Sequence, residues 1–222
     1  MKYINIHTHK CSESLNVLEI VNQYPNSFEE IGGCFSIGIH PWHINENSWK
    51  QELVVIEEKL QLENCLALGE CGLDKRRETP IKLQIEVFEA QLLLAEKYKI
   101  PVIIHCVAAF QELIALKQKL KITIPLVIHG FSKSEELAEQ LIKQGFYISF
   151  GKYLIRNSEL KSVFEKIPND CFFLETDTIE EGIEEVYALA AKFKKIDVVT
   201  LQHIVTKNFN TVFKNGRMDR TN

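Results

Sequence analysis

Histidine and carboxylate side chains recur in this sequence where short apolar segments end. The first such segment, INIHTHK, has isoleucines at positions 4 and 6 and histidines at positions 7 and 9. Imidazole is a poor filler for a hydrophobic core, so this pair needs another explanation. Comparable polar residues end further segments: His40 in CFSIGIH, Glu70 in CLALGE, His105 in PVIIH, His129 in PLVIH and Asp177 in CFFLETD.

Together these side chains suit divalent metal ions. Residues i and i+2 of a strand point to the same side, so His7 and His9 can share one ion. One tetrahedral ion needs fewer ligands than the set provides, which indicates two ions about 3.5–4 Å apart with a bridging carboxylate, as in two-metal hydrolases. Imidazoles and carboxylates are ligands that Zn²⁺ or Mn²⁺ accepts, and the set comprises His7, His9, His105, His129, Glu70 and Asp177.

Each residue also has an ordinary structural interpretation when it is taken alone. His105 and His129 are each explained by a hydrogen-bonded histidine at the end of a strand. Glu70 and Asp177 are explained by capping of the helix that follows. Six such residues at corresponding positions favour the metal centre, because buried charges this dense need an ion or one another.

Eight segments have the composition of strands that are buried on both faces, because they are short, apolar and rich in β-branched or aromatic residues. They cover residues 3–7, 17–24, 34–40, 65–70, 101–105, 125–129, 146–151 and 171–177. Amphipathic stretches between and after them predict helices at 81–98 and 131–146 and near 48–62, 109–121, 158–166, 181–194 and 197–213.

Eight strands that alternate with helices predict an α/β fold, a (β/α)8 TIM barrel. The connection between the first two strands is too short for a full helix, so we expect the barrel to be distorted there. The carboxyl ends of all barrel strands meet at one rim, where barrel enzymes keep their active sites. A doubly wound open sheet is the structural alternative.

Length and composition are consistent with one domain over residues 1–222, with a polar tail from about residue 214 that we expect to fray. The net charge of −4 argues against a protein that holds long duplex DNA on a broad basic surface. The six cysteines are scattered without a C-x-x-C pair, which is typical of reduced thiols. With neither a signal peptide nor a membrane-spanning stretch, we expect a cytoplasmic protein without a membrane partner.

Several motifs together resemble one family, the TatD-related metal-dependent hydrolases within the amidohydrolase-like barrels. The resemblance runs from residue 3 to about residue 213, and its specific parts are G-E-x-G-L-D and the E-T-D ending. The matching motifs are HTH at 7–9, GIHPW at 38–42, LGECGLD at 68–74, PVIIHC at 101–106, VIHGFSKS at 127–134 and FLETD at 173–177.

The resemblance implies a distorted barrel with two divalent ions, Mg²⁺, Mn²⁺ or Zn²⁺. One ion would take His7, His9, Glu70 and Asp177, and the other Glu70, His105 and His129, so that Glu70 forms the bridge. The ions would activate a water, while Asp177 would orient it and accept its proton. Asp177 and Glu70 are thus the expected catalytic residues.

Members of this family are phosphodiester hydrolases, typically DNases with exonuclease character, and some relatives are described as deacylases. The resemblance therefore predicts a deoxyribonuclease that acts at a DNA end. One alternative keeps the metals but acts on an amide, ester or lactone of a small molecule, and another is a non-catalytic metal-binding barrel. The oligomeric state is not predicted.

Substrate contacts are predicted on the same rim. His40, in the family's G-x-H-P segment, is a candidate partner of a phosphate or a leaving group. Lys75, Arg76 and Lys133 follow predicted strands and would give the site a basic mouth, as would Lys152 and Arg156. Solvated surface charge is the alternative for each of these cations.

The chain departs from the family pattern at two places. Asn5 stands where the family usually has Asp, and strand alternation places it on the face of His7 and His9. CVAAF follows at 106–110 where the family usually has an Arg-Asp pair, which removes a plausible phosphate anchor. Cys71 and Cys106 adjoin predicted ligands, and alternation predicts that both belong to the core.

Overall fold

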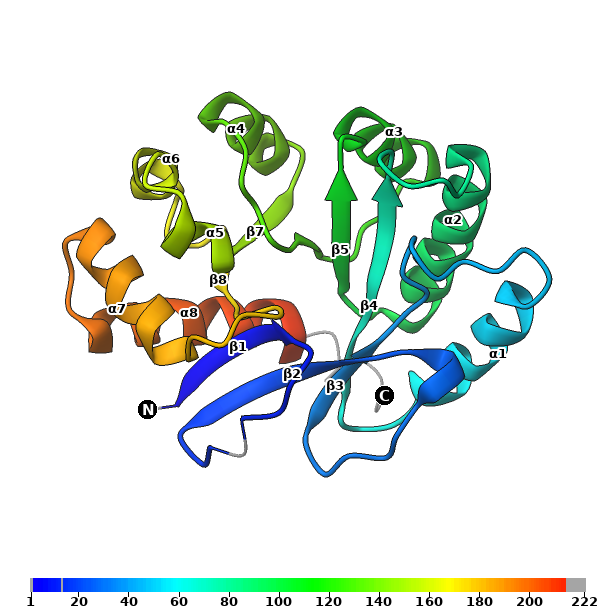
Figure 1. The fold of residues 1–222 in the computed structure, drawn as a ribbon, viewed down its shortest axis with the longest axis horizontal. Helices are drawn as coiled ribbons and strands as arrows, with labels where there is room; N and C mark the ends of the chain where they lie inside the picture. Colours follow the sequence, from blue (N-terminus) through cyan, green and yellow to red (C-terminus); the bar gives the residue numbers. More distant parts are fainter. Residues whose placement is uncertain (1, 13, 215–222) are drawn as a thin grey trace.

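Eight parallel strands follow one another around a barrel in their order along the chain (Figure 1). The computed structural model describes residues 2–12 and 14–214, so the predicted fraying of the tail concerns residues that lie outside this range. The strands are β1 (Tyr3–Thr8), β2 (Val17–Gln23), β3 (Cys34–Ile37), β4 (Cys65–Asp74), β5 (Val102–Val107), β6 (Leu126–Ile128), β7 (Phe146–Phe150) and β8 (Phe172–Leu174).

The barrel closes between its last strand and its first. Thr8 and Asp177 form a parallel bridge. Asp177 N–H donates to the His7 carbonyl at 3.0 Å, and His9 N–H donates to the Asp177 carbonyl at 3.1 Å. A doubly wound sheet has two open edges and a reversal of strand order, and neither occurs among the described strands. The predicted distorted barrel is therefore confirmed.

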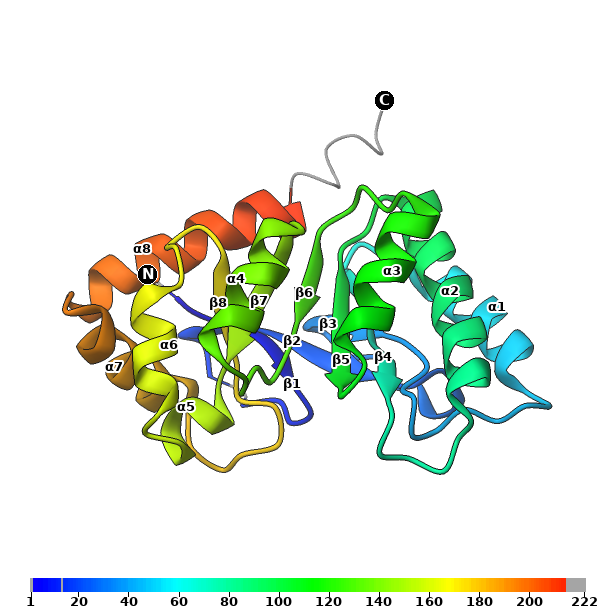
Figure 2. The same ribbon diagram turned by 90° about the horizontal axis from the view of Figure 1, so that it is seen from above.

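Helices cover the outside of the strands (Figures 1 and 2). As predicted, no helix separates β1 from β2 in the described residues, and only a 3-10 turn, Pro25–Ser27, separates β2 from β3. The five-residue α5 was not predicted from the sequence. The helices are α1 (Trp49–Lys59), α2 (Ile81–Tyr98), α3 (Phe110–Leu120), α4 (Glu135–Lys143), α5 (Lys152–Arg156), α6 (Leu160–Lys166), α7 (Ile183–Lys194) and α8 (Val198–Phe209).

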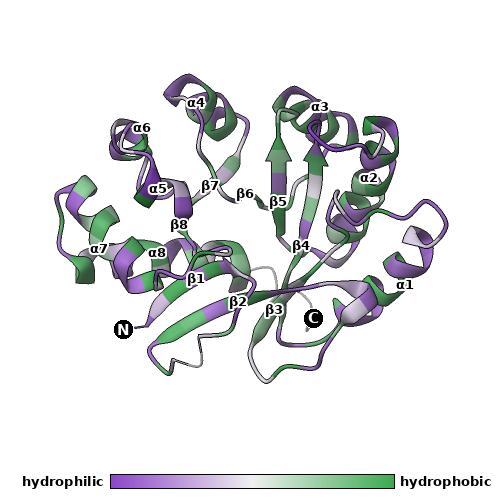
Figure 3. Ribbon diagram, viewed as in Figure 1, coloured by the Kyte–Doolittle hydropathy of each residue, from purple (hydrophilic) through white to green (hydrophobic). Residues whose placement is uncertain are grey.

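The core lies between the strands and the apolar faces of these helices. The strands are coloured mainly as hydrophobic in Figure 3, whereas the helices carry both colours. On α2, the residues Phe88, Leu92 and Ala95 of the predicted stripe are at most 1% exposed. No helix of the described residues is long and apolar enough to cross a membrane.

The prediction that Asn5 shares the face of His7 and His9 is wrong. The pairing register between β1 and β2 shifts between Asn5 and Thr8. A bulge of this kind changes which side chains share a face. Asn5 lines a second cavity together with Thr8 and Glu19, and its amide pairs with Thr176, donating to the hydroxyl at 2.9 Å and accepting from the backbone N–H at 3.1 Å.

Candidate metal centre

The six predicted ligands meet at the carboxyl ends of the strands. His7 belongs to β1, Glu70 to β4 and His105 to β5. The other three, His9, His129 and Asp177, directly follow β1, β6 and β8 within three residues. Their convergence follows from barrel topology, because every parallel strand ends at the same rim.

Glu70 occupies the middle of this cluster and divides it into two halves. Its Oε2 lies 3.4 Å from Nε2 of both His7 and His9. Its Oε1 lies 2.9 Å from His105 Nδ1 and 2.8 Å from His129 Nε2. The two oxygens of one carboxylate thus face two separate groups of imidazoles, which is the arrangement that a bridging ligand needs.

Asp177 completes the half that contains His7 and His9. Its Oδ1 lies 3.8 Å from His7 Nε2 and 3.5 Å from His9 Nε2. Its backbone is left-handed, with φ 55°, a conformation that Asp tolerates better than most residues. Its side chain is 21% exposed, so this carboxylate is open to the cavity described below.

Charge at the centre is set by the coupling of Glu70 with its histidines. Burial opposes ionisation of Glu70, but the positive charge of His129 and hydrogen bonds from His105, His129 and His40 outweigh it and hold the pKa well below its usual range. Burial also opposes protonation of His129, yet the charges of Glu70 and Glu175 raise its pKa well above the usual value. An ionised Glu70 is the form that binds a cation.

His7 indicates most directly that a cation fits here. The residue is fully buried, and neither of its ring nitrogens has a hydrogen-bond partner within the part of the chain that the structure describes. A buried polar group without a partner costs about 1–3 kcal/mol. Three sets of ligand atoms lie within 4.8 Å of one another: His7, His129 and Asp177; His7, His9 and Glu70; and His40, Glu70 and His105. Imidazole nitrogens and carboxylate oxygens are suitable donors for a divalent ion.

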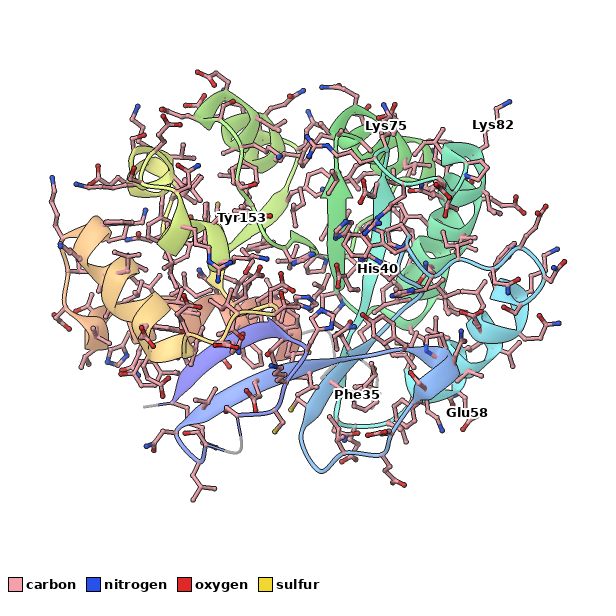
Figure 4. All side chains as sticks on the ribbon, in the orientation of Figure 1. Phe35, His40, Glu58, Lys75, Lys82 and Tyr153 are labelled. Atoms are coloured by element: carbon pink, nitrogen blue, oxygen red, sulfur yellow. The ribbon has the colours of Figure 1, made fainter. Side chains whose placement is uncertain are left out.

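His40 lies closer to the centre than its predicted role as a substrate contact required (Figure 4). It is 4% exposed, and burial lowers its pKa. Its Nδ1 accepts the Trp42 backbone N–H at 3.1 Å, so the neutral ring carries its proton on Nε2. That nitrogen donates to Glu70 Oε1 at 3.0 Å.

A cavity of about 550 Å³ opens above the centre. Trp42, which is 46% exposed, and Tyr153, which is 41% exposed, supply aromatic surface. The cations Arg76, Lys133 and Lys152 also line this cavity.

Two predicted cations lie elsewhere. Lys75 does not line the cavity, and its ammonium group forms an ion pair with Glu112 at 2.5 Å. Arg156 pairs with Glu181 at 3.8 Å and is likewise not part of the lining.

Part of the cavity wall is apolar. Val107, Phe110 and Phe131 line it, and Val107 belongs to the CVAAF stretch. Cys106 also lines the cavity, although it is only 9% exposed, whereas Cys71 is fully buried as predicted. Burial raises the pKa of the Cys106 thiol to about 12, so it is uncharged at neutral pH.

Several polar residues around the ligands were not predicted from the sequence. Asn22 accepts the Glu70 backbone N–H at 2.7 Å. The Tyr24 hydroxyl lies 3.5 Å from His9 Nδ1, and burial together with the charges of Glu70 and Asp177 raises its pKa to about 12. Asp74 lies behind His105 and Glu175 behind His129, each at 3.5 Å. Both belong to motifs quoted above, GLD and ETD, which was the signal that could have revealed them.

Comparisons with known proteins agree with this architecture. A family model described as TatD related DNase matches residues 1–214. The chain is 30% identical over 156 residues to an "uncharacterized metal-dependent hydrolase" of Haemophilus influenzae, covering 65% of this chain and 58% of the relative. It is 32% identical over 172 residues to the "3'-5' ssDNA/RNA exonuclease TatD" of Erwinia tasmaniensis, covering 74% of this chain and 63% of the relative. The matched segment thus spans about three-fifths of these curated relatives.

Solved structures share the fold over nearly the whole chain. The TatD homologue YJJV from Escherichia coli superposes with a TM-score of 0.81 at 21% identity, covering 95% of this chain and 97% of that one. A TatD family hydrolase from Entamoeba histolytica gives a TM-score of 0.79 at 17% identity, covering 96% and 98%.

Proposed function

Because this chain belongs to the TatD-related DNase family, we propose that it is a two-metal hydrolase that cleaves phosphodiester bonds at an end of a DNA strand. The family is one of metal-dependent hydrolases, and some relatives carry the name of a single-strand exonuclease. The observation that carries the proposal is Glu70, whose two oxygens face two groups of imidazoles beneath an open cavity.

The proposed ligand sets follow the two halves of the cluster. His7, His9, Glu70 and Asp177 would hold one ion, and Glu70, His105 and His129 the other. When bound, the ions supply positive charge that lowers the pKa of a water and neutralises the phosphate oxygens. His40 keeps Glu70 ionised and oriented by donating its Nε2 proton to Oε1.

Asp177 is the proposed proton acceptor. Its side chain reaches the cavity, where it can accept a hydrogen bond from the attacking water and then its proton. Arg76 and Lys133 remain proposed contacts to phosphates of the substrate, because both line the cavity. Lys75 is withdrawn from this role, since Glu112 already engages its ammonium group.

A small-molecule ester, amide or lactone is the second candidate substrate. The apolar wall formed by Val107, Phe110 and Phe131 favours it, because this wall offers a phosphate no hydrogen bond from a side chain. A non-catalytic barrel is the least favoured interpretation, since the complete ligand cluster opens to solvent through the cavity. A cytoplasmic location stays a prediction.

The decisive experiment is an activity panel with metal-stripped protein. Mg²⁺, Mn²⁺ or Zn²⁺ would be added back, and single-stranded DNA labelled at the 5′ or the 3′ end would be assayed beside a chromogenic phosphodiester and a set of esters. We expect stepwise loss of nucleotides from one end. Glu70→Gln, purified in parallel, should be inactive and controls for contaminating nucleases. Glu52→Gln, a buried carboxylate on α1, should retain activity.

Robust ester turnover without DNA cleavage under any metal would replace the first candidate with the second. Absence of turnover on every substrate, with zinc still bound, would favour the non-catalytic barrel.

A further inference from the structure

Asp74, at the end of β4, is a buried carboxylate behind His105 that belongs to neither proposed ligand set. It is 3% exposed. Its Oδ2 lies 3.5 Å from His105 Nε2. The other ring nitrogen, Nδ1, lies 2.9 Å from Glu70 Oε1 and 3.3 Å from His129 Nε2. His105 therefore has one carboxylate in front of it, at the centre, and another behind it.

The backbone of Asp74 is held on both sides by one glutamine. Gln84, on α2, is fully buried. Its Oε1 accepts the Asp74 N–H at 2.7 Å, and its Nε2 donates to the Asp74 carbonyl at 3.0 Å and to the Thr79 carbonyl at 2.8 Å. The backbone of Asp74 is therefore held by α2, through contacts that do not involve the metal centre.

The Asp74 carboxylate receives further hydrogen bonds. Oδ1 accepts the Arg76 backbone N–H at 2.9 Å, and Oδ2 accepts the Trp42 indole N–H at 2.7 Å. Both oxygens of Asp74 thus act as acceptors. When an ion is bound at Nδ1 of His105, the single proton of the neutral ring is on Nε2, which faces Asp74 Oδ2.

We propose that Asp74 is a positioning residue: in the metal-loaded protein it accepts the His105 proton on Nε2 and so orients the ring with Nδ1 towards the metal centre. The inference rests on the metal centre of the proposed function and adds to it the means by which one ligand is oriented. A hydrogen bond to the far nitrogen of an imidazole fixes its tautomer and ring orientation and raises its basicity as a ligand.

The four candidate imidazole ligands are not supported equally. His7 has no hydrogen-bond partner among the described residues, and the far nitrogen of His9 faces only the Tyr24 hydroxyl at 3.5 Å. His129 Nδ1 lies 3.5 Å from Glu175 Oε1 but lacks hydrogen-bond geometry. His105 is the one of the four whose far nitrogen has a hydrogen-bond contact with a carboxylate in the described structure.

A purely structural role for Asp74 is the competing explanation. Trp42 lies at the cavity, and its indole donates the shortest hydrogen bond that Asp74 accepts. Arg77 stacks on the Trp42 ring at 3.5 Å from its centre. If Asp74 served only to hold this rim, loss of Trp42 would reproduce the effect of losing Asp74.

Zinc binding to the metal-stripped full-length protein separates these roles. Three variants would be titrated in competition with a chelating indicator: Asp74→Asn, Trp42→Phe and the buried-carboxylate control Glu52→Gln. We expect Asp74→Asn to weaken zinc binding by about 10–100-fold, which is usual for such hydrogen-bond partners. The other two variants should stay close to the unaltered protein. Trp42→Phe matching the loss in Asp74→Asn would overturn the proposal, as would unchanged zinc affinity in Asp74→Asn.

Nitrogen NMR of the histidine rings gives a test that needs no variant. In the unaltered zinc-loaded protein, His105 should bind zinc through Nδ1 and retain a proton on Nε2, whereas His129 should bind through Nε2. Zinc bound through Nε2 of His105 would overturn the proposal even if Asp74→Asn failed to fold. Both readouts are independent of hydrolysis, so failure to cleave DNA would leave this inference standing. Failure of the unaltered protein to bind zinc would overturn this inference alone, because the proposed hydrolase activity is also assayed with Mg²⁺ and Mn²⁺.

Discussion

Asp177 combines a left-handed backbone with a carboxylate that is partly open to the cavity. We expect Asp177→Asn to lower kcat by about 10²–10⁴-fold, because an amide cannot accept the proton of the attacking water. Asn also tolerates the left-handed conformation, so the fold should be kept. Steady-state kinetics on the substrate found in the panel, with thermal unfolding alongside, would check both statements. Asp170→Asn, at an exposed carboxylate, is the matched control, and an Asp177→Asn rate equal to that of the unaltered protein would contradict the assigned role.

The candidate ligands could be predicted because each lies near the end of an apolar segment of the sequence, and barrel topology brings the carboxyl-terminal parts of all the strands to one rim. Their partners could not be predicted in the same way. The contact between Asp74 and His105 joins two strands and depends on how a glutamine of α2 holds the backbone. The face of Asn5 was predicted wrongly because strand alternation takes no account of a bulge.

Among the structural elements, β4 packs closely against the backbone of β5 beside the site. Gly72 has φ 142°, and a Cβ atom there would lie 2.0 Å from the His105 carbonyl oxygen. We expect Gly72→Ala to destabilise the fold by about 3 kcal/mol or more, since backbone strain and overpacking both contribute. Urea unfolding would measure this. Gly33→Ala is the control, because nothing lies within 4 Å of its Cβ position. A stability close to that of the unaltered protein in Gly72→Ala would show that β4 and β5 separate more easily than this packing implies.

Glu96 joins the end of α2 to the loop before β6. It accepts the Thr123 hydroxyl at 2.6 Å and the Thr123 N–H at 2.8 Å, and it pairs with Lys99. Although burial opposes ionisation of Glu96, these hydrogen bonds lower its pKa from 4.5 to about 2.

A lowered pKa in the folded state stabilises the protein above the unfolded pKa, and this stabilisation is lost as the pH falls towards 2. We expect the free energy of unfolding of the unaltered protein to exceed that of Glu96→Gln by about 1 kcal/mol at pH 7. This value is reduced because Glu96 is partly exposed to solvent. This difference in the free energy of unfolding should decrease below pH 4.5 and disappear near pH 2. Urea unfolding across this range, with the exposed Glu86→Gln on the same helix as control, measures it. A gap that does not change with pH would refute the linkage.

The boundaries of the elements show where sequence patterns lose resolution. The predicted fourth strand ended at Glu70, but β4 continues to Asp74, because CGLD is fully buried beside β5 and pairs with it. The short α5 was not predicted, because five residues are less than two helical turns and are too few to show an apolar periodicity. The long amphipathic α2 was predicted with its observed bounds, because eighteen residues repeat one face several times.

At the scale of the whole molecule, the candidate metal centre brings together residues from both ends of the chain. β1 and β8 meet at the closure beside Asp177, and Glu70 and His105 lie across the barrel mouth. An ion held by residues of β1, β4 and the segment after β8 therefore ties the closure to the rest of the barrel. A ligand that binds only the folded state stabilises it in proportion to its affinity and concentration.

Chelation should accordingly lower the melting temperature. Ions at a free concentration of about a hundred times their Kd stabilise the folded state by about 2.7 kcal/mol. This corresponds to a rise in melting temperature of about 5–10 °C for a chain of this size. Differential scanning fluorimetry with EDTA, followed by Mn²⁺ or Zn²⁺ in excess, measures the fall and its recovery. His129→Ala should reduce the shift because the proposed ion loses a ligand, whereas His203→Ala, on the exposed face of α8, should leave it intact. An unchanged melting temperature on chelation and re-addition would mean that no bound ion stabilises the closed barrel. The buried ring nitrogens of His7, which lack a hydrogen-bond partner in the described structure, would then need another explanation.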